Sequence, residues 1–437
     1  MLFDYIYVDL KNNENINNKF FDLCKKYKII IKFIKKTYNY FNKNSCLLTD
    51  NFSYWKTKEL KNYILFLNNE YKNNIIFNKE YLEFNSLNIL FDIFNNFYKK
   101  INNMTIIGKY CGERFDLTQA GGGNISFKQH NLLVIKSSGI KISEISNKNG
   151  YTILLNNKIK NKINIFNEKL SKKEREQCCK KIMMNNLIIK TQRPSIETTL
   201  HSILKTYTIH LHPIQVNILT VQKNAYKILS NIFPNALIIN YHTPGIDLAL
   251  NIKKKYNNEK IIFLLNHGVI FTTDNKKEII NLIKNTINKI EKIINITFNK
   301  YKLTNKISKI YDKLFNNNLF CYLSEDFNLI NNIKILSQMK SLYPDYSVYC
   351  GYKCLYMYNL NKQIIINYYN KYKTIPKILI INKNIYIVGN SLNKCKDIED
   401  VLKGHLLVYK NSSNYKIITN DEINYLNNWE AEKYRQL

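Results

Sequence analysis

Glycine and proline are absent from the first 107 residues of this chain, which has 437 residues, 12 glycines and 6 prolines. These two residues mark most turns, so their absence predicts a helical N-terminal segment, 1–99, mixed with strands and with asparagine and lysine in its turns. Within it, apolar residues at helical spacing predict a helix over 84–101. No motif in this segment indicates its role.

Arginine is also scarce, since the 65 basic residues are 61 lysines and 4 arginines. The net charge of +32 would suit a phosphate-rich partner. Arginine, however, is the residue that best recognises phosphates and base edges. The lysines are spread through the whole chain among Asn, Ile and Tyr, as an A/T-rich coding bias would leave them. Nucleic acid is therefore not the partner we expect, despite the basic charge.

Long hydrophobic runs are missing as well. No stretch approaches the ~20 apolar residues that a membrane helix needs, and the N-terminus carries Asp4 and Asp9 in place of a signal peptide's apolar core. The nine cysteines form neither a disulfide framework nor a CxxC pair, and their odd number favours a reducing compartment. We expect a soluble, cytoplasmic protein of two or three domains with no membrane segment.

The composition changes along the chain. Residues 155–185 are polar and lysine-rich, which predicts a loop. From about residue 300 the patterns predict a helix, two strand regions and a second helix, over 306–318, 346–360, 377–390 and 394–410. The last third, 299–437, is therefore predicted to be an α+β region.

Seven of the twelve glycines fall within 108–150, and three of them are consecutive, Gly121 to Gly123. The run ends in Asn124 and precedes an alternating strand, ISFK, and a second strand with its turn, LLVIKSSG. Converging backbone N–H groups and nearby Asn and Ser side chains can bind an anion. The loop matches neither the Walker nor the GxGxxG pattern, and a hairpin turn without a ligand explains its glycines equally well.

Histidine is rare, yet three of the seven lie within 193–214. TIHLHPI alternates as a strand does, so His210 and His212 are predicted to share one face. His267 lies between strand-like runs in LLNHGVIFTT and offers a third ligand. Three neutral imidazoles leave one position open on a divalent metal, the usual arrangement in catalytic zinc sites. Any one of these histidines alone would more simply be structural.

A carboxylate lies thirteen residues before the first of the paired histidines. RPSIETTLHSIL predicts a short helix that begins near Pro194, with Ser195 as the capping residue and Glu197 in the first turn. Without the histidines, Glu197 would be interpreted as a surface acid that complements the helix dipole. His201, at i+4 from Glu197, is predicted to be a partly buried helix residue with a local hydrogen bond.

The order and spacing of these motifs resemble those of the class II aldolase/adducin family. GGGNISFK resembles its glycine–asparagine loop, VIKSSG its second phosphate-side turn, RPSIETTLH its glutamate-bearing helix, and HLHP and LLNHGV its metal ligands. With QAGGGN and YHTPG added, the set is most similar to the aldolase part of the long rhamnulose-phosphate aldolase/dehydrogenase subgroup. The likeness covers roughly 100–295.

The resemblance implies an α/β fold in which 100–298 form a three-layer α/β/α domain around a mainly antiparallel sheet, assembled as a cyclic homo-tetramer. It implies reversible aldol cleavage of a phosphorylated sugar through an enediolate, with Zn²⁺ or another divalent ion on His210, His212 and His267. Glu197 would move the proton. The substrate phosphate would be held by Gly123, Asn124, Ser138, Gly139 and Ser195.

One departure from the subgroup concerns the cofactor. No dinucleotide fingerprint follows the aldolase-like part, because Gly351, Gly389 and Gly404 are isolated, so we expect no NAD chemistry. The same set of residues also serves epimerases, dehydratases and decarboxylases of this fold. Adducins keep the fold as non-catalytic interaction proteins, but the presence of all three histidines and Glu197 argues against that alternative. With 33 tyrosines in the chain, a catalytic tyrosine from a neighbouring subunit cannot be chosen.

Overall fold

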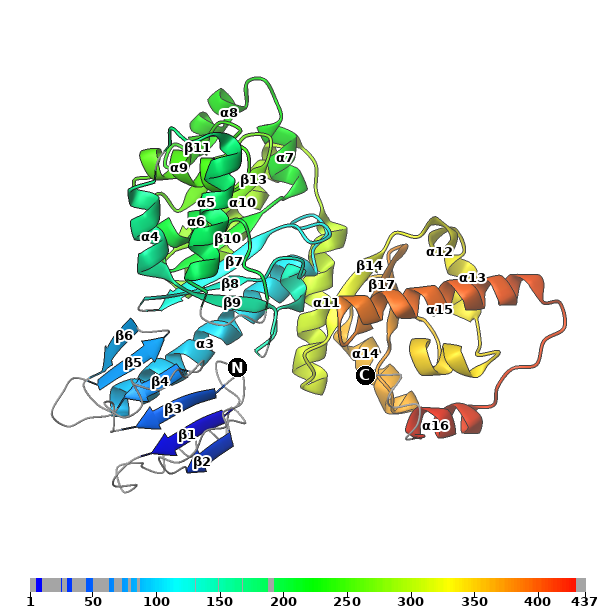
Figure 1. Ribbon diagram of the computed structural model, residues 1–437. Helices are drawn as coiled ribbons and strands as arrows, with labels where there is room; N and C mark the ends of the chain where they lie inside the picture. Colours follow the sequence, from blue (N-terminus) through cyan, green and yellow to red (C-terminus); the bar gives the residue numbers. More distant parts are fainter. Residues whose placement is uncertain are drawn as a thin grey trace. The chain divides into compact units, whose positions relative to one another are not determined.

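The computed structural model describes most of the chain from residue 87 onwards (Figure 1). The described residues are 5–9, 25, 30–33, 45–49, 63–66, 73–77, 80–84, 87–129, 131–147, 149–166, 168–187 and 192–429. They divide into two compact units: unit 1 comprises 1–108 and 120–290, and unit 2 comprises 109–119 and 291–437. The boundaries expected at 99/100 and 298/299 stay predictions.

The described residues before residue 85 are strands in all but one position. They form one six-stranded sheet in the order β2-β1-β3-β4-β5-β6, with parallel pairs from β2 to β4 and antiparallel pairs from β4 to β6. The strands are β1 (Tyr5–Asp9), β2 (Ile30–Phe33), β3 (Ser45–Thr49), β4 (Tyr63–Phe66), β5 (Asn73–Phe77) and β6 (Glu80–Phe84).

The mixture of helices and strands expected for 1–99 is represented among the described residues before 85 almost entirely by strands. Runs such as IIKF and YILF are rich in β-branched and aromatic residues, which favour strands. The helix predicted over 84–101 is present as α3 (Leu87–Gly112).

Unit 1 is built on a seven-stranded sheet in the order β11-β12-β13-β10-β7-β8-β9. Every neighbouring pair is antiparallel except β11 and β12. The strands are β7 (Asn124–Gln129), β8 (Leu132–Lys136), β9 (Tyr151–Leu155), β10 (Tyr207–Leu211), β11 (Leu237–Ile239), β12 (Ile261–Leu264) and β13 (Gly268–Thr273). The strands predicted around ISFK, LLVIK, TIHL and the NHG turn are all confirmed.

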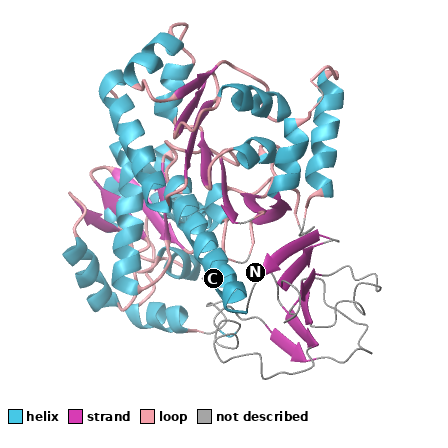
Figure 2. Cartoon of the chain, turned by 90° about the vertical axis from the view of Figure 1, so that its left-hand side faces the viewer, coloured by secondary structure: helices cyan, strands magenta, loops and turns pink. Residues whose placement is uncertain are grey.

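Helices cover both faces of this sheet (Figure 2). On one face, apolar residues of β8, β9, β12 and β13 pack in two clusters against α4 (Asn156–Asn164), α5 (Lys172–Asn185), α6 (Thr198–Ile203) and α9 (Ile246–Lys255). On the other face, Ile125, Ile209 and Tyr207 lie with Met104 and Ile107 of α3 and with Ile279 of α10 (Lys276–Ile294). The predicted three-layer α/β/α domain with a mainly antiparallel sheet is confirmed.

The loop predicted over 155–185 is wrong, because helices α4 and α5 occupy most of that stretch. Their apolar residues are few but fall on one side, where Ile159, Ile163, Cys179 and Met183 are buried. The lysines and asparagines that suggested a loop form the solvent-facing side. Two further helices of unit 1 are α7 (Ile214–Thr220) and α8 (Ala225–Ile232).

Unit 2 contains a four-stranded sheet in the order β14-β17-β16-β15. Its strands are β14 (Phe320–Ser324), β15 (Leu355–Met357), β16 (Ile378–Ile381) and β17 (Asn384–Gly389). Its helices are α11 (Asn299–Phe315), α12 (Phe327–Asn331), α13 (Ile333–Gln338), α14 (Lys362–Tyr372), α15 (Leu392–Asn411) and α16 (Asn420–Asn428), with a π-helix over Tyr346–Cys350.

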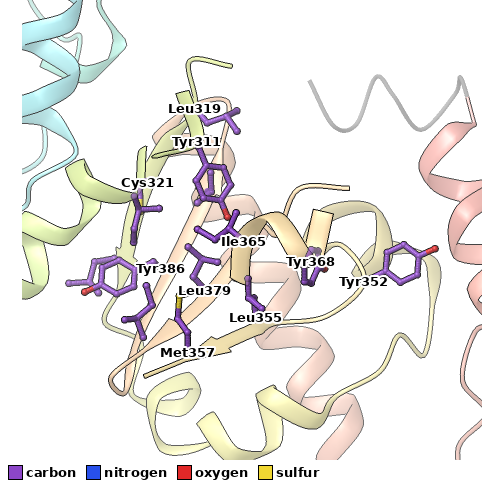
Figure 3. Packing of buried hydrophobic residues seen from close by; sticks show 14 of the residues in the cluster. Tyr311, Leu319, Cys321, Tyr352, Leu355, Met357, Ile365, Tyr368, Leu379 and Tyr386 are labelled. Carbon is purple, nitrogen blue, oxygen red and sulfur yellow. The ribbon is translucent and has the colours of Figure 1, made fainter. Parts of the chain in front are cut away.

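The core of unit 2 is rich in tyrosine (Figure 3). Tyr311 and Tyr386 are fully buried, and their hydroxyls donate to the backbone oxygens of Pro376 and Lys300 at 2.6 and 3.0 Å. These bonds satisfy the polar end of each ring inside the core. The predicted α+β organisation is present, but the strand predicted over 346–360 begins only at Leu355, after the π-helix.

Candidate metal centre

Strand β10 occupies the middle of the sheet in unit 1, between β7 and β13. The register places His210 opposite Asn124 of β7 and Ile270 of β13. Because both neighbours run antiparallel to β10, its C-terminal end lies beside the first residues of β7 and β13. The sheet therefore brings the HLH, GGGN and NHG motifs, far apart in sequence, to the same end of three adjacent strands.

Three imidazoles meet at this end. The ring centroids of His210 and His212 are 4.8 Å apart, those of His210 and His267 are 4.7 Å apart, and those of His212 and His267 are 5.1 Å apart. One ligand atom from each residue lies within 4.8 Å of the others. Small ring rotations would bring these nitrogens to one ion, given metal–imidazole bonds of roughly 2.0–2.1 Å. The structure thus places the three predicted ligands together.

Gly268 makes this close approach possible. A Cβ atom at this position would lie 2.4 Å from the backbone oxygen of Leu211 and 2.9 Å from Cδ2 of His212. Both contacts are shorter than van der Waals distance, and the first is to backbone that cannot turn aside. The glycine after His267 is therefore a steric requirement for packing β13 against the histidine-bearing strand.

The histidine nitrogens suit a metal ion. Among the described residues, Nε2 of His210, Nε2 of His212 and Nδ1 of His267 are buried without a hydrogen-bond partner. Burial is the main cause that lowers the pKa of His212 to about 3 and of His267 to about 4. Both rings are therefore neutral near pH 7 and offer lone pairs. Buried polar atoms are rarely left unpaired, so this donor set fits a divalent cation.

Glu197 lies directly against the histidines. One carboxylate oxygen, Oε1, is 2.7 Å from Nδ1 of His210, and the other, Oε2, accepts from the Asn124 amide at 3.3 Å. A bond from the Nδ1–H group of His210 to the carboxylate would leave Nε2 free for a metal, as carboxylates bonded to metal-binding histidines do elsewhere. The residue is the N-cap of α6 and not, as predicted, part of its first turn.

The charge state of Glu197 results from two opposing effects. Burial raises the pKa of this carboxyl, whereas the His210 imidazole, with smaller contributions from His201 and His267, lowers it. The lowering is larger, so the pKa lies well below its usual range and the group is ionised at neutral pH. An ionised carboxylate beside these imidazoles is a proton acceptor at the edge of a metal site.

The residues predicted to bind phosphate come from three segments that the structure joins. Gly123 and Gly139 both have positive φ, 77° and 79°, which glycine adopts without strain. The backbone N–H of Ser138 donates to the Arg193 oxygen at 2.9 Å, and the Asn124 amide donates to the Ser195 hydroxyl. Loops 121–124, 137–139 and 193–195 therefore form one continuous lining.

Two details of that lining differ from expectation. The Ser195 hydroxyl accepts from the backbone N–H of Glu197 at 3.2 Å, and the helix cap is Glu197 itself. The Asn124 amide is buried against Ser195 and Glu197, while Ser138 and Gly139 are exposed. Asn124 thus contacts the carboxylate as well as the candidate anion loop.

The sequence patterns did not predict the contacts of two buried residues near the site. Lys136 donates to the backbone oxygens of Ser137 and Ile140 at 3.2 and 2.7 Å, and so closes the loop that carries Ser138. His201 is completely buried, and its Nδ1 lies 2.7 Å from the hydroxyl of Ser126, so its bond is not local. Their positions in the sequence could have indicated a role at the site, because Lys136 directly precedes the SSG turn and His201 is four residues after Glu197.

Part of the chain matches a known family. Residues 107–287 match the model of the Class II Aldolase and Adducin N-terminal domain. These residues form a class II aldolase/adducin domain. The match covers the whole seven-stranded sheet and all three motifs of the candidate site.

Among the described residues, no helix combines the length and apolar character needed to cross a membrane.

Solved structures similar to the aldolase/adducin domain include the N-terminal class II aldolase domain of a conserved protein from Thermoplasma acidophilum. That structure is 22% identical with a TM-score of 0.40, and the match covers 44% of this chain and 93% of that one. An L-fuculose 1-phosphate aldolase is 19% identical with a TM-score of 0.32, over 48% of this chain and 95% of that one. A sugar-phosphate aldolase from Thermotoga maritima is 13% identical with a TM-score of 0.34, over 46% and 95%.

A similar protein of known sequence is Protein Ycf2 of Physcomitrium patens, which is 27% identical over 447 residues. The match covers 94% of this chain but only 17% of that protein's length. Its name specifies no chemistry, so the assignment of the aldolase/adducin domain rests on the family model.

Proposed function

We propose that this chain is a metal-dependent aldolase-type lyase that cleaves or forms a carbon–carbon bond in a sugar phosphate. The observation that carries the proposal is the meeting of three imidazoles, each with a buried unpaired nitrogen, and an ionised glutamate bonded to one of them. In the proposal, His210, His212 and His267 hold a divalent ion. The ion would act as a Lewis acid towards the carbonyl and an adjacent hydroxyl of the substrate.

Glu197 is the proposed proton-transfer group. Its Oε1 is held by His210, and its Oε2 is held by the Asn124 amide, so the carboxylate has a fixed orientation at the edge of the site. A base must lie within hydrogen-bond reach of the proton that it moves. The carboxylate would take or return the proton at the carbon where the bond breaks or forms.

The substrate phosphate is proposed to lie along the joined loops, against Gly123, Asn124, Ser138, Gly139 and Ser195. Backbone N–H groups at positive-φ glycines and side-chain hydroxyls provide donors without steric obstruction. The exposure of Ser138 and Gly139 leaves this side of the lining open to solvent.

Several finer assignments belong to the same proposal. They are Zn²⁺ as the native ion, a homo-tetramer, a cytoplasmic location, absence of NAD chemistry, and membership of the rhamnulose-phosphate subgroup. A sugar-phosphate epimerase or dehydratase would use the same metal and glutamate, so it is the second candidate. An adducin-like interaction protein would need neither the metal nor an ionised Glu197.

Metal analysis of the purified full chain tests the site. We expect about one divalent ion per chain in the wild type and loss of that ion in His210→Ala. His405→Ala is the matched control, because His405 is also buried but lies in α15 of unit 2. Unchanged metal content in His210→Ala would contradict the ligand assignment.

Activity assays then test the reaction. A panel of ketose 1-phosphates should release dihydroxyacetone phosphate from at least one member in the presence of the metal. Epimerised or dehydrated products without carbon–carbon cleavage would favour the second candidate. A protein that binds no metal and turns over no substrate would fit the adducin-like alternative instead.

A further inference from the structure

Helix α6 meets the sheet through contacts between side chains at two positions that lie one turn apart. At its N-cap, Glu197 contacts Asn124 of β7 and His210 of β10. Four residues later, Nδ1 of His201 lies 2.7 Å from the hydroxyl of Ser126, also on β7. Both contacts are formed by side chains with almost no exposure to solvent.

The spacing of these contacts fits the geometry of the two elements. Asn124 and Ser126 are two residues apart on β7, so their side chains leave the same face, roughly 6.5 Å apart along the strand. Glu197 and His201 are four residues apart, roughly 6 Å along a helix axis. The spacing of the two residues along the helix therefore matches the spacing along the strand, so both contacts can form together.

Two anchor points constrain α6 more than one would. The helix has only six residues, Thr198–Ile203, so it offers few backbone bonds to resist tilting or rotation. Without the bond at His201, the start of the helix would be held to the sheet by Glu197 alone, because the bond from Lys128 of β7 to the Leu204 oxygen, 2.7 Å, lies at its far end. The start of the helix could then tilt and carry the carboxylate away from His210. The second anchor at His201 removes this freedom.

The His201 imidazole has one further property. Its Nε2 is buried with no hydrogen-bond partner among the described residues, so the bond to Ser126 through Nδ1 is its polar contact with the sheet. An isolated buried imidazole costs free energy unless it is bonded. A leucine would fill the same space without that cost, which indicates that the bond itself has a role.

We propose that His201 and Ser126 form a positioning pair that holds α6 in register with β7 and so keeps the Glu197 carboxylate against His210. Neither residue touches the reacting atoms in this proposal. The structural part stands on the contacts alone, and its catalytic consequence rests on the proposed function of Glu197.

The variants separate the bond from general packing. Ser126→Ala and His201→Leu remove it, whereas His201→Asn keeps a polar atom near the position of Nδ1. Ser202→Ala is the matched control, because Ser202 is equally buried on α6 but its hydroxyl bonds to Thr199 of the same helix.

The first measurement needs no activity. Proton NMR of the metal-free full chain, labelled with ¹⁵N-histidine, reports the His210 Nδ1–H bonded to Glu197, assigned by its absence in His210→Ala. We expect the resonance to persist in Ser202→Ala and His201→Asn. It should shift or exchange away in Ser126→Ala and His201→Leu.

The second measurement is steady-state kinetics. We expect Ser126→Ala and His201→Leu to lower kcat by roughly 10–100-fold, the range seen when residues that support a metal site are replaced, with KM and metal content retained. His201→Asn should recover most of kcat. If the bond-removing variants behave like Ser202→Ala in both measurements, or if His201→Asn fails as His201→Leu does, the positioning role is wrong. Loss of turnover in every chain, wild type included, would refute only the proposed function, because the NMR result stands apart from it.

Discussion

Two buried glutamates, one in each unit, have pKa values that are shifted in opposite directions. Glu197 and Glu113 have 7% and 5% of their surface exposed. In unit 1, the histidines around Glu197 overcome the effect of burial and lower its pKa. In unit 2, burial raises the pKa of Glu113 to about 7, although Lys109 and three hydrogen bonds act against it. The two pKa values differ because different groups surround the two carboxylates.

The hydrogen-bond donors to Glu113 are neutral groups. Its carboxylate accepts from the Asn305 amide and the Ser308 hydroxyl, both at 2.8 Å, and from the backbone N–H of Cys321 at 3.2 Å. These donors hold the side chain in place but offset only part of the cost of burying its charge. In unit 1, imidazoles keep the Glu197 carboxylate ionised. In unit 2, the Glu113 carboxylate can take up a proton near neutral pH. Hydrogen bonds from neutral donors alone therefore do not keep a buried carboxylate ionised.

The largest expected effect separates the two glutamates by activity. Glu197→Gln keeps the shape but removes the proton acceptor, so turnover should fall roughly 10²–10⁴-fold, the usual contribution of a general acid or base. Metal content should be retained. Glu113→Gln is the control and should turn over at a near wild-type rate. Near wild-type turnover in Glu197→Gln would make that carboxylate structural.

The next effect is a pH dependence of stability that Glu113 should cause. Its pKa rises from an ordinary 4.5 to about 7 on folding, so the folded state binds the proton more tightly. Stability should therefore fall as pH rises from about 5 to about 7 and stay low above that, a loss of about 3 kcal/mol for this group.

Urea denaturation at pH 5 and pH 8 measures this loss. Other titrating groups contribute equally to the wild type and to Glu113→Gln, so the difference between their pH slopes isolates Glu113. Equal slopes would show that Glu113 titrates as an exposed carboxyl does.

The amide donors of the two glutamates offer a smaller, paired test. Asn305→Ala removes a bond to a buried carboxylate and should cost about 1–3 kcal/mol of stability. KM and kcat should not change. The free energy of unfolding from denaturant titration measures the cost, and a value within error of zero would mean that another donor replaces the amide.

Asn124→Ala is the counterpart in unit 1 and should act on binding. Asn124 lies between the carboxylate and the candidate anion loop. We expect a raised KM for the phosphorylated substrate, with the metal retained, if the contact is equally strong in ground and transition states. An unchanged KM would place the phosphate elsewhere.

Local patterns were enough to predict the strands that carry the site. Alternation in TIHL and the strand-like runs around NHG predicted where His210 and His267 would lie in the sheet, because side-chain direction repeats every two residues. The helices over 155–185 could also have been predicted. Ser171 and Glu174 form a capping box at the start of α5, with the S-x-x-E pattern that marks a helix N-terminus.

Contacts between distant segments could not be predicted in this way. Asn124 and Glu197 are 73 residues apart, and Ser126 and His201 are 75 apart. No periodicity connects such positions, since they meet only through the order of strands in the sheet. Glu113 shows the same limit, because CGERF and PSIET look alike until their folded partners are known.

The tight packing at Gly268 has a consequence for recognising such sites in other chains. A histidine pair is common, and a substitution elsewhere can restore a lost ligand. A side chain at position 268 would press into the backbone of Leu211, so every substitution there should separate the strands that hold the ligands. In a saturation-mutagenesis screen scored for folded protein, position 268 should accept fewer alternatives than the histidines around it. The most informative residue of the NHG motif is thus the glycine, which has no reactive side chain.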